Sequence, residues 1–125
     1  MHPGNVRTLT AAKIDCCTLA NNHVLDWGYT GLAETLRTLR KAGIATTGVG
    51  EKLDTASAPA VIPSGKERQV LVFAFGSPTS GVPGEWAATD DRAGGNYLPS
   101  FSHDSLDLVV TKGSKATTAI DPTSR

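Results

Sequence analysis

The residues best suited to chemistry lie in one short stretch, Leu19-Ala-Asn-Asn-His-Val-Leu-Asp-Trp-Gly28. Its Asn side chains offer neutral amide oxygens that can bind a divalent metal, and His23 offers a ring nitrogen or a proton near neutral pH. Asp26 would either orient the imidazole through its other ring nitrogen or cap the helix that follows. The alternative is an Asn-rich loop whose side chains only satisfy the backbone of a turn.

Two strands and a helix would position this stretch. Ile14–Ala20 is a compact apolar run that predicts a buried strand, and Ile44–Val49 predicts a second one. Between them, leucines recur at helical spacing from an expected N-cap at Thr30 to an expected C-terminal glycine at Gly43. The three elements form a βαβ unit with parallel strands. The polar stretch then falls at the carboxyl edge of the sheet, where ligands of open α/β folds bind.

The second half of the chain has a different character. Ala60–Ile62 and Gln69–Phe75 predict two strands of a β-hairpin, and Gly76–Pro99 predicts a long loop rich in Gly and Pro. One more apolar run, Leu106–Val110, precedes a tail with little to bury. The expected fold class is therefore α/β, with one domain over residues 1–110 and a frayed C-terminal tail over residues 111–125.

Composition and charge exclude two classes of partner. Twelve Lys and Arg balance twelve Asp and Glu, which argues against a nucleic-acid surface because such surfaces carry a basic excess. The apolar runs are far shorter than the ~20 residues of a membrane helix, and no signal-peptide pattern opens the sequence. We therefore expect no membrane segment in this chain, and the compartment stays open. The adjacent Cys16 and Cys17 are expected to be small buried hydrophobes rather than a disulfide or a metal site.

The remaining polar and aromatic candidates are each expected to have a structural role. They comprise His2 as an exposed side chain, His103 with Asp104 as a helix cap, the Asp90–Asp91 pair as solvated loop carboxylates, Glu34 with Arg37 as a surface ion pair, and Trp27 and Trp86 as packing anchors.

Two segments together resemble a known family. Cys-Cys-Thr-Leu-Ala-Asn-Asn-His-Val-Leu-Asp-Trp-Gly, with the Gly-Leu-x-Glu-Thr-Leu pattern after it, and the later Val70-Leu-Val-Phe-Ala-Phe-Gly-Ser-Pro-Thr-Ser80 segment are similar to the CapA family. These bacterial proteins act in poly-gamma-glutamate capsule biosynthesis and are similar in fold to calcineurin-like metallophosphoesterases. The resemblance implies a partial metallophosphoesterase-like layered sandwich that contains the βαβ unit, the hairpin and the long loop.

The resemblance also implies roles for three residues. Asn22 would be a metal ligand, His23 would be the catalytic, substrate-facing acid or hydrogen-bond donor, and Asp26 would support them. Asn21 stands where metallophosphoesterases usually have Gly, so the loop departs from that pattern. Divalent metal ions would be the cofactors of the complete domain, and capsule polymer or other capsule biosynthesis proteins would be the partners.

The family's other metal-binding motifs are not found in this sequence. One Asn and one His cannot assemble a two-metal site, because such metals take about 4–6 ligands. We therefore expect a central fragment of the family's domain that binds no metal and is inactive by itself. The alternative function is a non-enzymatic component of polymer assembly or export, or an inactive remnant, in which the loop is structural.

Overall fold

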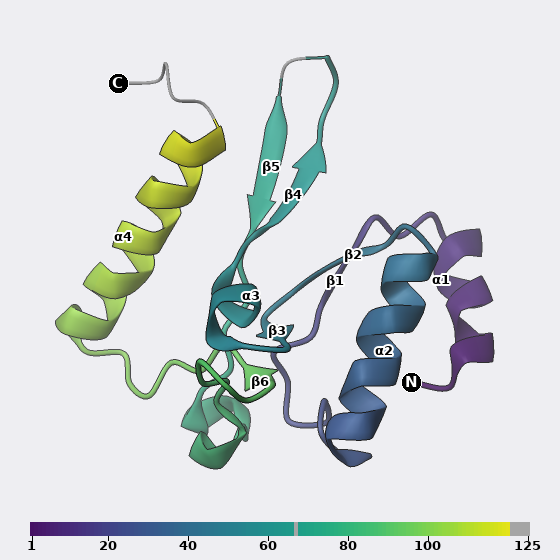
Figure 1. The fold of residues 1–125 in the computed structure, drawn as a ribbon. Coiled ribbons are helices and arrows are strands. Elements are labelled where there is room, and N and C mark those ends of the chain that lie inside the picture. Colours follow the sequence, from purple (N-terminus) through teal and green to yellow (C-terminus); the bar gives the residue numbers. More distant parts are fainter. Residues whose placement is uncertain (67, 121–125) are drawn as a thin grey trace.

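The structure is a computed structural model that describes residues 1–66 and 68–120. It is a mixed α/β fold with three two-stranded sheets in the described part (Figure 1). The helices are α1 (Val6–Ala11), α2 (Gly28–Lys41), α3 (Leu53–Ser57) and α4 (His103–Ile120). The strands are β1 (Cys16–Thr18), β2 (Ala45–Thr47), β3 (Val49–Gly50), β4 (Ala60–Pro63), β5 (Gln69–Val72) and β6 (Gly94–Gly95).

The predicted βαβ unit is confirmed. β1 and β2 pair in parallel, with Cys17 opposite Thr46, and α2 forms the crossover between them. The leucines of α2 are buried because they recur on the face of the helix that packs toward the strands. Gly43 follows the helix at φ +74°, a left-handed conformation that suits glycine at this position.

The start of α2 differs from the prediction. The helix begins at Gly28, and Trp27 occupies the N-cap position without a side-chain cap, so Thr30 lies inside the first turn. The cause is the preceding turn, in which the Gly28 N–H donates to the Leu25 carbonyl at 2.8 Å. This turn directs the backbone into the helix before the chain reaches a residue that could cap it.

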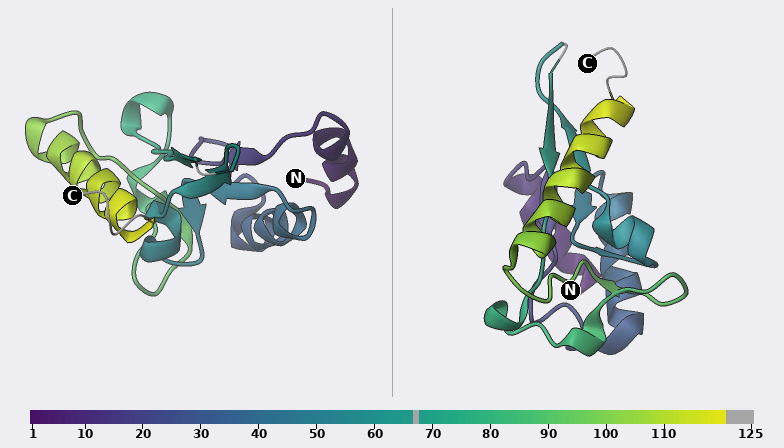
Figure 2. Two further views of the ribbon diagram at one scale, coloured as in Figure 1. Left: turned by 90° about the horizontal axis from the view of Figure 1, so that it is seen from above. Right: turned by 90° about the vertical axis from the view of Figure 1, so that its left-hand side faces the viewer.

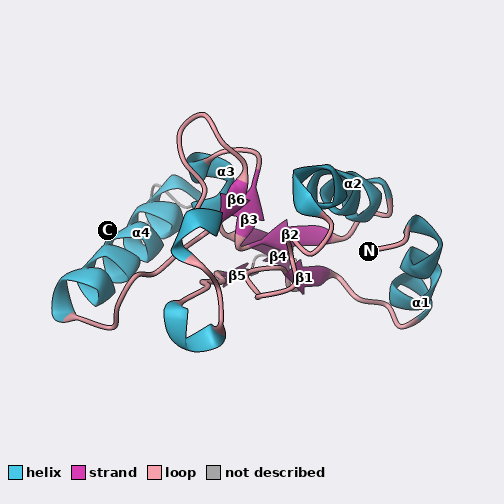
Figure 3. Ribbon diagram, turned by 90° about the horizontal axis from the view of Figure 1, so that it is seen from below, coloured by secondary structure: helices cyan, strands magenta, loops and turns pink. Residues whose placement is uncertain are grey.

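The predicted second strand is broken at Gly48. β2 ends at Thr47, and the chain turns at Gly48 with φ +89° before β3 pairs with β6 in an antiparallel sheet. The Gly48 carbonyl accepts a hydrogen bond from the Asn96 N–H at 2.8 Å, so this corner is tied to the second half of the chain. Figure 3 shows β3 and β6 side by side next to α3.

The predicted hairpin is confirmed, and the long loop is more ordered than expected. β4 pairs antiparallel with β5, although β5 ends at Val72 rather than at Phe75. Within the loop, Gly76 bridges to Tyr97, and two 3₁₀ turns precede β6. Asn96 is buried and donates from its side chain to the Ala74 carbonyl at 2.9 Å. Backbone pairing and the buried side chains of Val82, Ala88 and Leu98 therefore order this segment.

The C-terminal region is helical where a frayed tail was expected. α4 runs across the expected boundary at residue 110 as far as Ile120, and residues 121–125 lie outside the described part. Figure 2 shows α4 and α1 at opposite ends of the molecule. No helix among the described residues is long and apolar enough to cross a membrane.

Candidate functional site

The candidate site is the turn that joins β1 to α2. Leu25 is buried in a cluster with Leu32, Leu36 and Val49, and Val24 packs against that cluster. These contacts hold the turn to the body of the protein. The polar residues of the turn before and after Leu25 are exposed. Their side chains therefore lie on a loop that buried contacts hold in place.

His23 and Asp26 are brought together as the sequence suggested. His23 Nδ1 lies 2.9 Å from Asp26 Oδ2, and the two side chains are 75% and 47% exposed. The contact engages Nδ1, and no other residue in 1–66 or 68–120 forms a hydrogen bond with Nε2. Asp26 contacts the imidazole and does not occupy the N-cap position of α2, which belongs to Trp27.

The two asparagines have different surroundings. Asn21 shapes the turn, because its Oδ1 accepts a hydrogen bond from the His23 N–H at 2.9 Å. Asn22 is exposed, and its side chain lies so close to Gly81 that a Cβ built there would be 3.2 Å from Nδ2. No residue of the described part forms a hydrogen bond with the Asn22 amide, which leaves it available to a ligand.

The described residues do not make a metal centre by themselves. Across residues 1–66 and 68–120, no three His, Cys, Asp or Glu side chains come together in a group that could hold a metal ion. Asn22 and His23 provide two donors at most, and Asp26 is engaged with His23. This donor set does not fit a two-metal site of about 4–6 ligands per ion.

Trp27 was wrongly expected to be a packing anchor. Its side chain is 83% exposed, and it lines a hollow of about 210 Å³ together with Asn21 and His23. Trp86, by contrast, packs against the core as expected. The sequence does not predict that Trp27 is exposed and Trp86 is packed, because a Trp that follows a polar loop is found in either environment.

The other candidates have structural roles, but Ser102 rather than His103 or Asp104 caps α4. His2 Nδ1 accepts from the Gly4 N–H at 3.1 Å on the surface, and Asp91 accepts from the Thr89 hydroxyl at 2.7 Å. That hydrogen bond lowers the pKa of Asp91. His103 begins α4, and the Ser102 hydroxyl accepts from the Ser105 N–H at 3.4 Å in the capping position.

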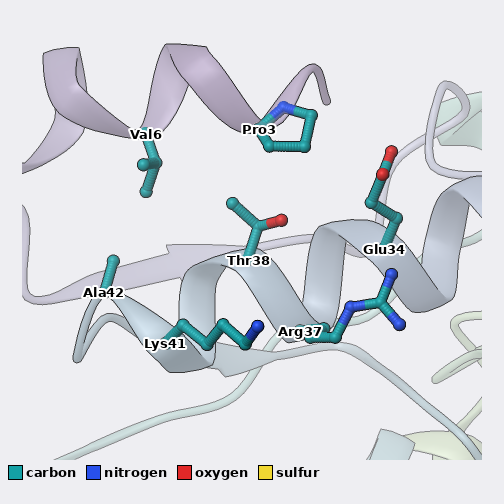
Figure 4. Close-up of a pocket in the computed structure, with 7 residues that line it drawn as sticks. All are labelled: Pro3, Val6, Glu34, Arg37, Thr38, Lys41 and Ala42. Carbon is teal, nitrogen blue, oxygen red and sulfur yellow. The ribbon is translucent and has the colours of Figure 1, made fainter.

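The expected ion pair between Glu34 and Arg37 is not found. Among the described residues, the ion pair that involves α2 is Arg40 with Glu51, at 3.7 Å. Glu34 and Arg37 instead line a cavity of about 400 Å³ between the N-terminal segment and α2, which Figure 4 shows with Lys41 beside them.

The cysteines of β1 are free thiols. Cys16 and Cys17 are both half-buried. Burial raises the pKa of both, and the neighbouring Cys17 raises the pKa of Cys16 further. A raised pKa leaves less of the nucleophilic thiolate at neutral pH.

Comparison with known proteins identifies the family. The sequence-family model named bacterial capsule synthesis protein PGA_cap matches residues 1–121. Probable polyglutamine synthesis accessory proteins from two strains of Mycobacterium tuberculosis are 48% identical over 94 residues, which cover 75% of this chain and 25% of theirs. An uncharacterized protein of Sinorhizobium fredii is 45% identical over 53 residues, covering 42% of this chain and 12% of its own length. The chain thus spans about a quarter of the length of its mycobacterial relatives. The resemblance seen in the sequence is confirmed, and the chain belongs to the bacterial capsule synthesis family.

Proposed function

We propose that this chain is the part of a capsule synthesis protein that presents His23, oriented by Asp26, to the phosphoryl group of a capsule-polymer precursor. The observation that carries the proposal is the 2.9 Å contact between His23 Nδ1 and Asp26 Oδ2. The contact lies on an exposed turn whose base is fixed by Leu25. An imidazole held in this way has a defined orientation, which a general acid needs.

The chemistry assigned to each residue follows from its free atoms. Asp26 holds Nδ1, so Nε2 of His23 is the atom that donates a hydrogen bond or a proton to a substrate oxygen. Asn22 would supply one neutral oxygen ligand to a divalent metal, with the other ligands coming from outside the described residues. The metallophosphoesterase-like layered sandwich belongs to this proposal as the context of the turn. The isolated chain should bind Mn²⁺ or Zn²⁺ no more tightly than a surface histidine does.

A second candidate function is a non-enzymatic role in polymer assembly. The mycobacterial relatives carry the name of accessory proteins, which supports a component that acts beside a synthetic enzyme. The partners would be capsule polymer or other capsule biosynthesis proteins. The turn would then be structural, with Asn21 and Asp26 serving only to fix its shape.

The test places this chain in the longer mycobacterial relative, where it replaces the matching segment. Phosphoesterase turnover and metal affinity are measured for His23→Ala, Asn22→Ala and Asp26→Asn, with Asp90→Asn on another loop as the matched control. His23→Ala should lower turnover by about 10²–10⁴-fold and leave metal affinity nearly intact. Asn22→Ala should lower metal affinity, and Asp26→Asn should lower turnover less than His23→Ala does. If all variants match the unsubstituted chimera in both assays, the turn is structural and the assembly role is favoured.

A further inference from the structure

A loop from the second half of the chain reaches the candidate site. It comprises residues 77–82, includes the 3₁₀ turn Pro78–Ser80, and touches the site at Gly81. The three atoms nearest to a Cβ built at Gly81, apart from its neighbours in the chain, all belong to the Asn22 side chain and lie at 3.2, 3.5 and 3.6 Å. Asn22 therefore lies along the side of Gly81 that the side chain of another residue would fill.

Hydrogen bonds and a buried side chain hold this loop in shape. The Ser80 hydroxyl accepts from the Ser77 N–H and donates to the Ser77 carbonyl, both at 2.9 Å. The Val82 N–H donates to the same carbonyl at 3.1 Å, and the Val82 side chain is buried. Between them, the Gly81 N–H donates to the Pro78 carbonyl at 3.0 Å. The backbone at Gly81 is thus fixed to the body of the protein and gives Asn22 a firm surface to rest on.

The two asparagines of the site are constrained in different ways. Asn21 is held by the hydrogen bond that its Oδ1 accepts from the His23 N–H. The Asn22 side chain is exposed, and within residues 1–66 and 68–120 its amide forms no hydrogen bond. A side chain of this kind can change rotamer unless a neighbour blocks some of its positions. Because the Gly81 backbone lies against Asn22, it removes the rotamers that would point into the loop.

We infer that Gly81 is a positioning residue of the candidate site and acts through Asn22. The inference rests on the proposed function, since it takes the Asn22 amide as a group that serves the reaction. A Cβ at position 81 would lie 3.2 Å from the amide nitrogen, closer than the separation of about 3.5–4.0 Å at which such atoms attract. Any side chain there pushes the amide away by a few tenths of an ångström. The site is therefore built from two loops, residues 19–28 and residues 77–82.

A simpler explanation is that Gly81 serves only its own turn, because φ +75° by itself favours glycine. Gly43 separates the two explanations, since it has φ +74° and a Cβ built there meets nothing within 4 Å. Gly43→Ala therefore introduces the same backbone strain without the contact. Gly81→Asn is the converse variant, because Asn tolerates the left-handed conformation better than Ala does and still adds a Cβ.

The first experiment observes the Asn22 amide directly by NMR in the full chain. Its side-chain signals are identified by their loss in Asn22→Ala. Gly81→Ala and Gly81→Asn should both shift these signals, and Gly43→Ala should leave them in place. Unshifted signals in both variants at position 81, or an equal shift in Gly43→Ala, would overturn the inference. If Gly81→Ala impairs folding, Gly81→Asn still decides the question.

The second experiment measures phosphoesterase turnover at limiting Mn²⁺ in the chimera with the mycobacterial relative. A misplacement of about 1 Å costs roughly 10²-fold in rate, so a displacement of a few tenths of an ångström should cost about 2–10-fold. Gly81→Ala should lower turnover by this factor and should have no further effect when Asn22 is already alanine. Gly43→Ala should leave turnover unchanged.

The two possible failures can be told apart. If Asn22→Ala lowers turnover but Gly81→Ala costs the same with and without the Asn22 side chain, Gly81 does not act through Asn22 and only the present inference is overturned. If Asn22→Ala changes neither turnover nor metal affinity, the proposed role of Asn22 is wrong. A shift of the NMR signals would in that case show that Gly81 only shapes the loop, which overturns its positioning role as well.

Discussion

Gly48 is a position where one added methyl group should damage the fold next to the candidate site. It is buried, has φ +89°, and lies where β2 turns toward β3. A Cβ built at Gly48 would lie 2.7 Å from Ala20 Cβ and 2.8 Å from Ala74 Cβ, closer than such atoms come in proteins. Ala20 directly precedes the candidate site, so Gly48→Ala would press on the base of the His23 turn.

The expected loss has two parts. A left-handed conformation costs an L-residue about 1–2 kcal/mol, and overpacking a filled site costs about 1–3 kcal/mol. Gly48→Ala should therefore lower the free energy of unfolding by roughly 2–5 kcal/mol. Gly65→Ala is the matched control, because Gly65 has φ +84° and a Cβ built there meets nothing within 4 Å. It should lose only about 1–2 kcal/mol.

Urea unfolding of the two variants separates the cost of the left-handed backbone conformation from the cost of the close contacts. Both substitutions reduce the entropy of the unfolded chain equally, so the difference between their free energies of unfolding reports the contacts with Ala20 and Ala74. Equal losses in the two variants would show that the chain relaxes freely around Gly48. The close approach would then have no role in holding the site.

Two further outcomes follow from burial. Leu32 is 1% exposed and Leu108 is 54% exposed, so Leu32→Ala should lower the free energy of unfolding by about 2–4 kcal/mol and Leu108→Ala by less than about 0.5 kcal/mol. Similar losses in the two would contradict the assigned core. Burial raises the pKa of Cys16 and Cys17, so less thiolate is present at neutral pH than in an ordinary cysteine. Alkylation by iodoacetamide should therefore be slower in the folded chain than in urea, and the gap should narrow as pH rises. Equal rates at neutral pH would exclude the raised pKa values.

The parts of the fold that could be predicted are those specified by side-chain periodicity. The leucines of α2 and the apolar runs around β1, β4 and β5 have repeats that identify a helix and strands. β3 and β6 could not be found in this way. Their pairing joins Val49–Gly50 to Gly94–Gly95, and two glycines have no side-chain pattern. A Cβ at Gly94 would be closer than a contact distance to the backbone of Trp86 and Ala88, so packing rather than periodicity selects glycine there.

The candidate site was predicted more completely in its residue types than in its surroundings. The spacing of His23 and Asp26 was enough to suggest their contact, because residues three apart in a turn come close. The position of Trp27 was not predictable, since its exposure depends on where the turn enters α2. The metal-binding role of Asn22 remains a prediction.

The antiparallel pairing of β3 with β6 also determines the order in which parts of the chain can fold during synthesis. The βαβ unit needs only the first part of the chain and can form as soon as β2 leaves the ribosome. β3 follows directly but must wait for Gly94–Gly95, and the Gly48 carbonyl must wait for Asn96. Until then the β2–β3 corner and the base of the His23 turn lack their final support. Nascent chains stalled before Gly94 should therefore carry a formed α2 beside an unformed site, which exposes that region to chaperones and proteases during translation.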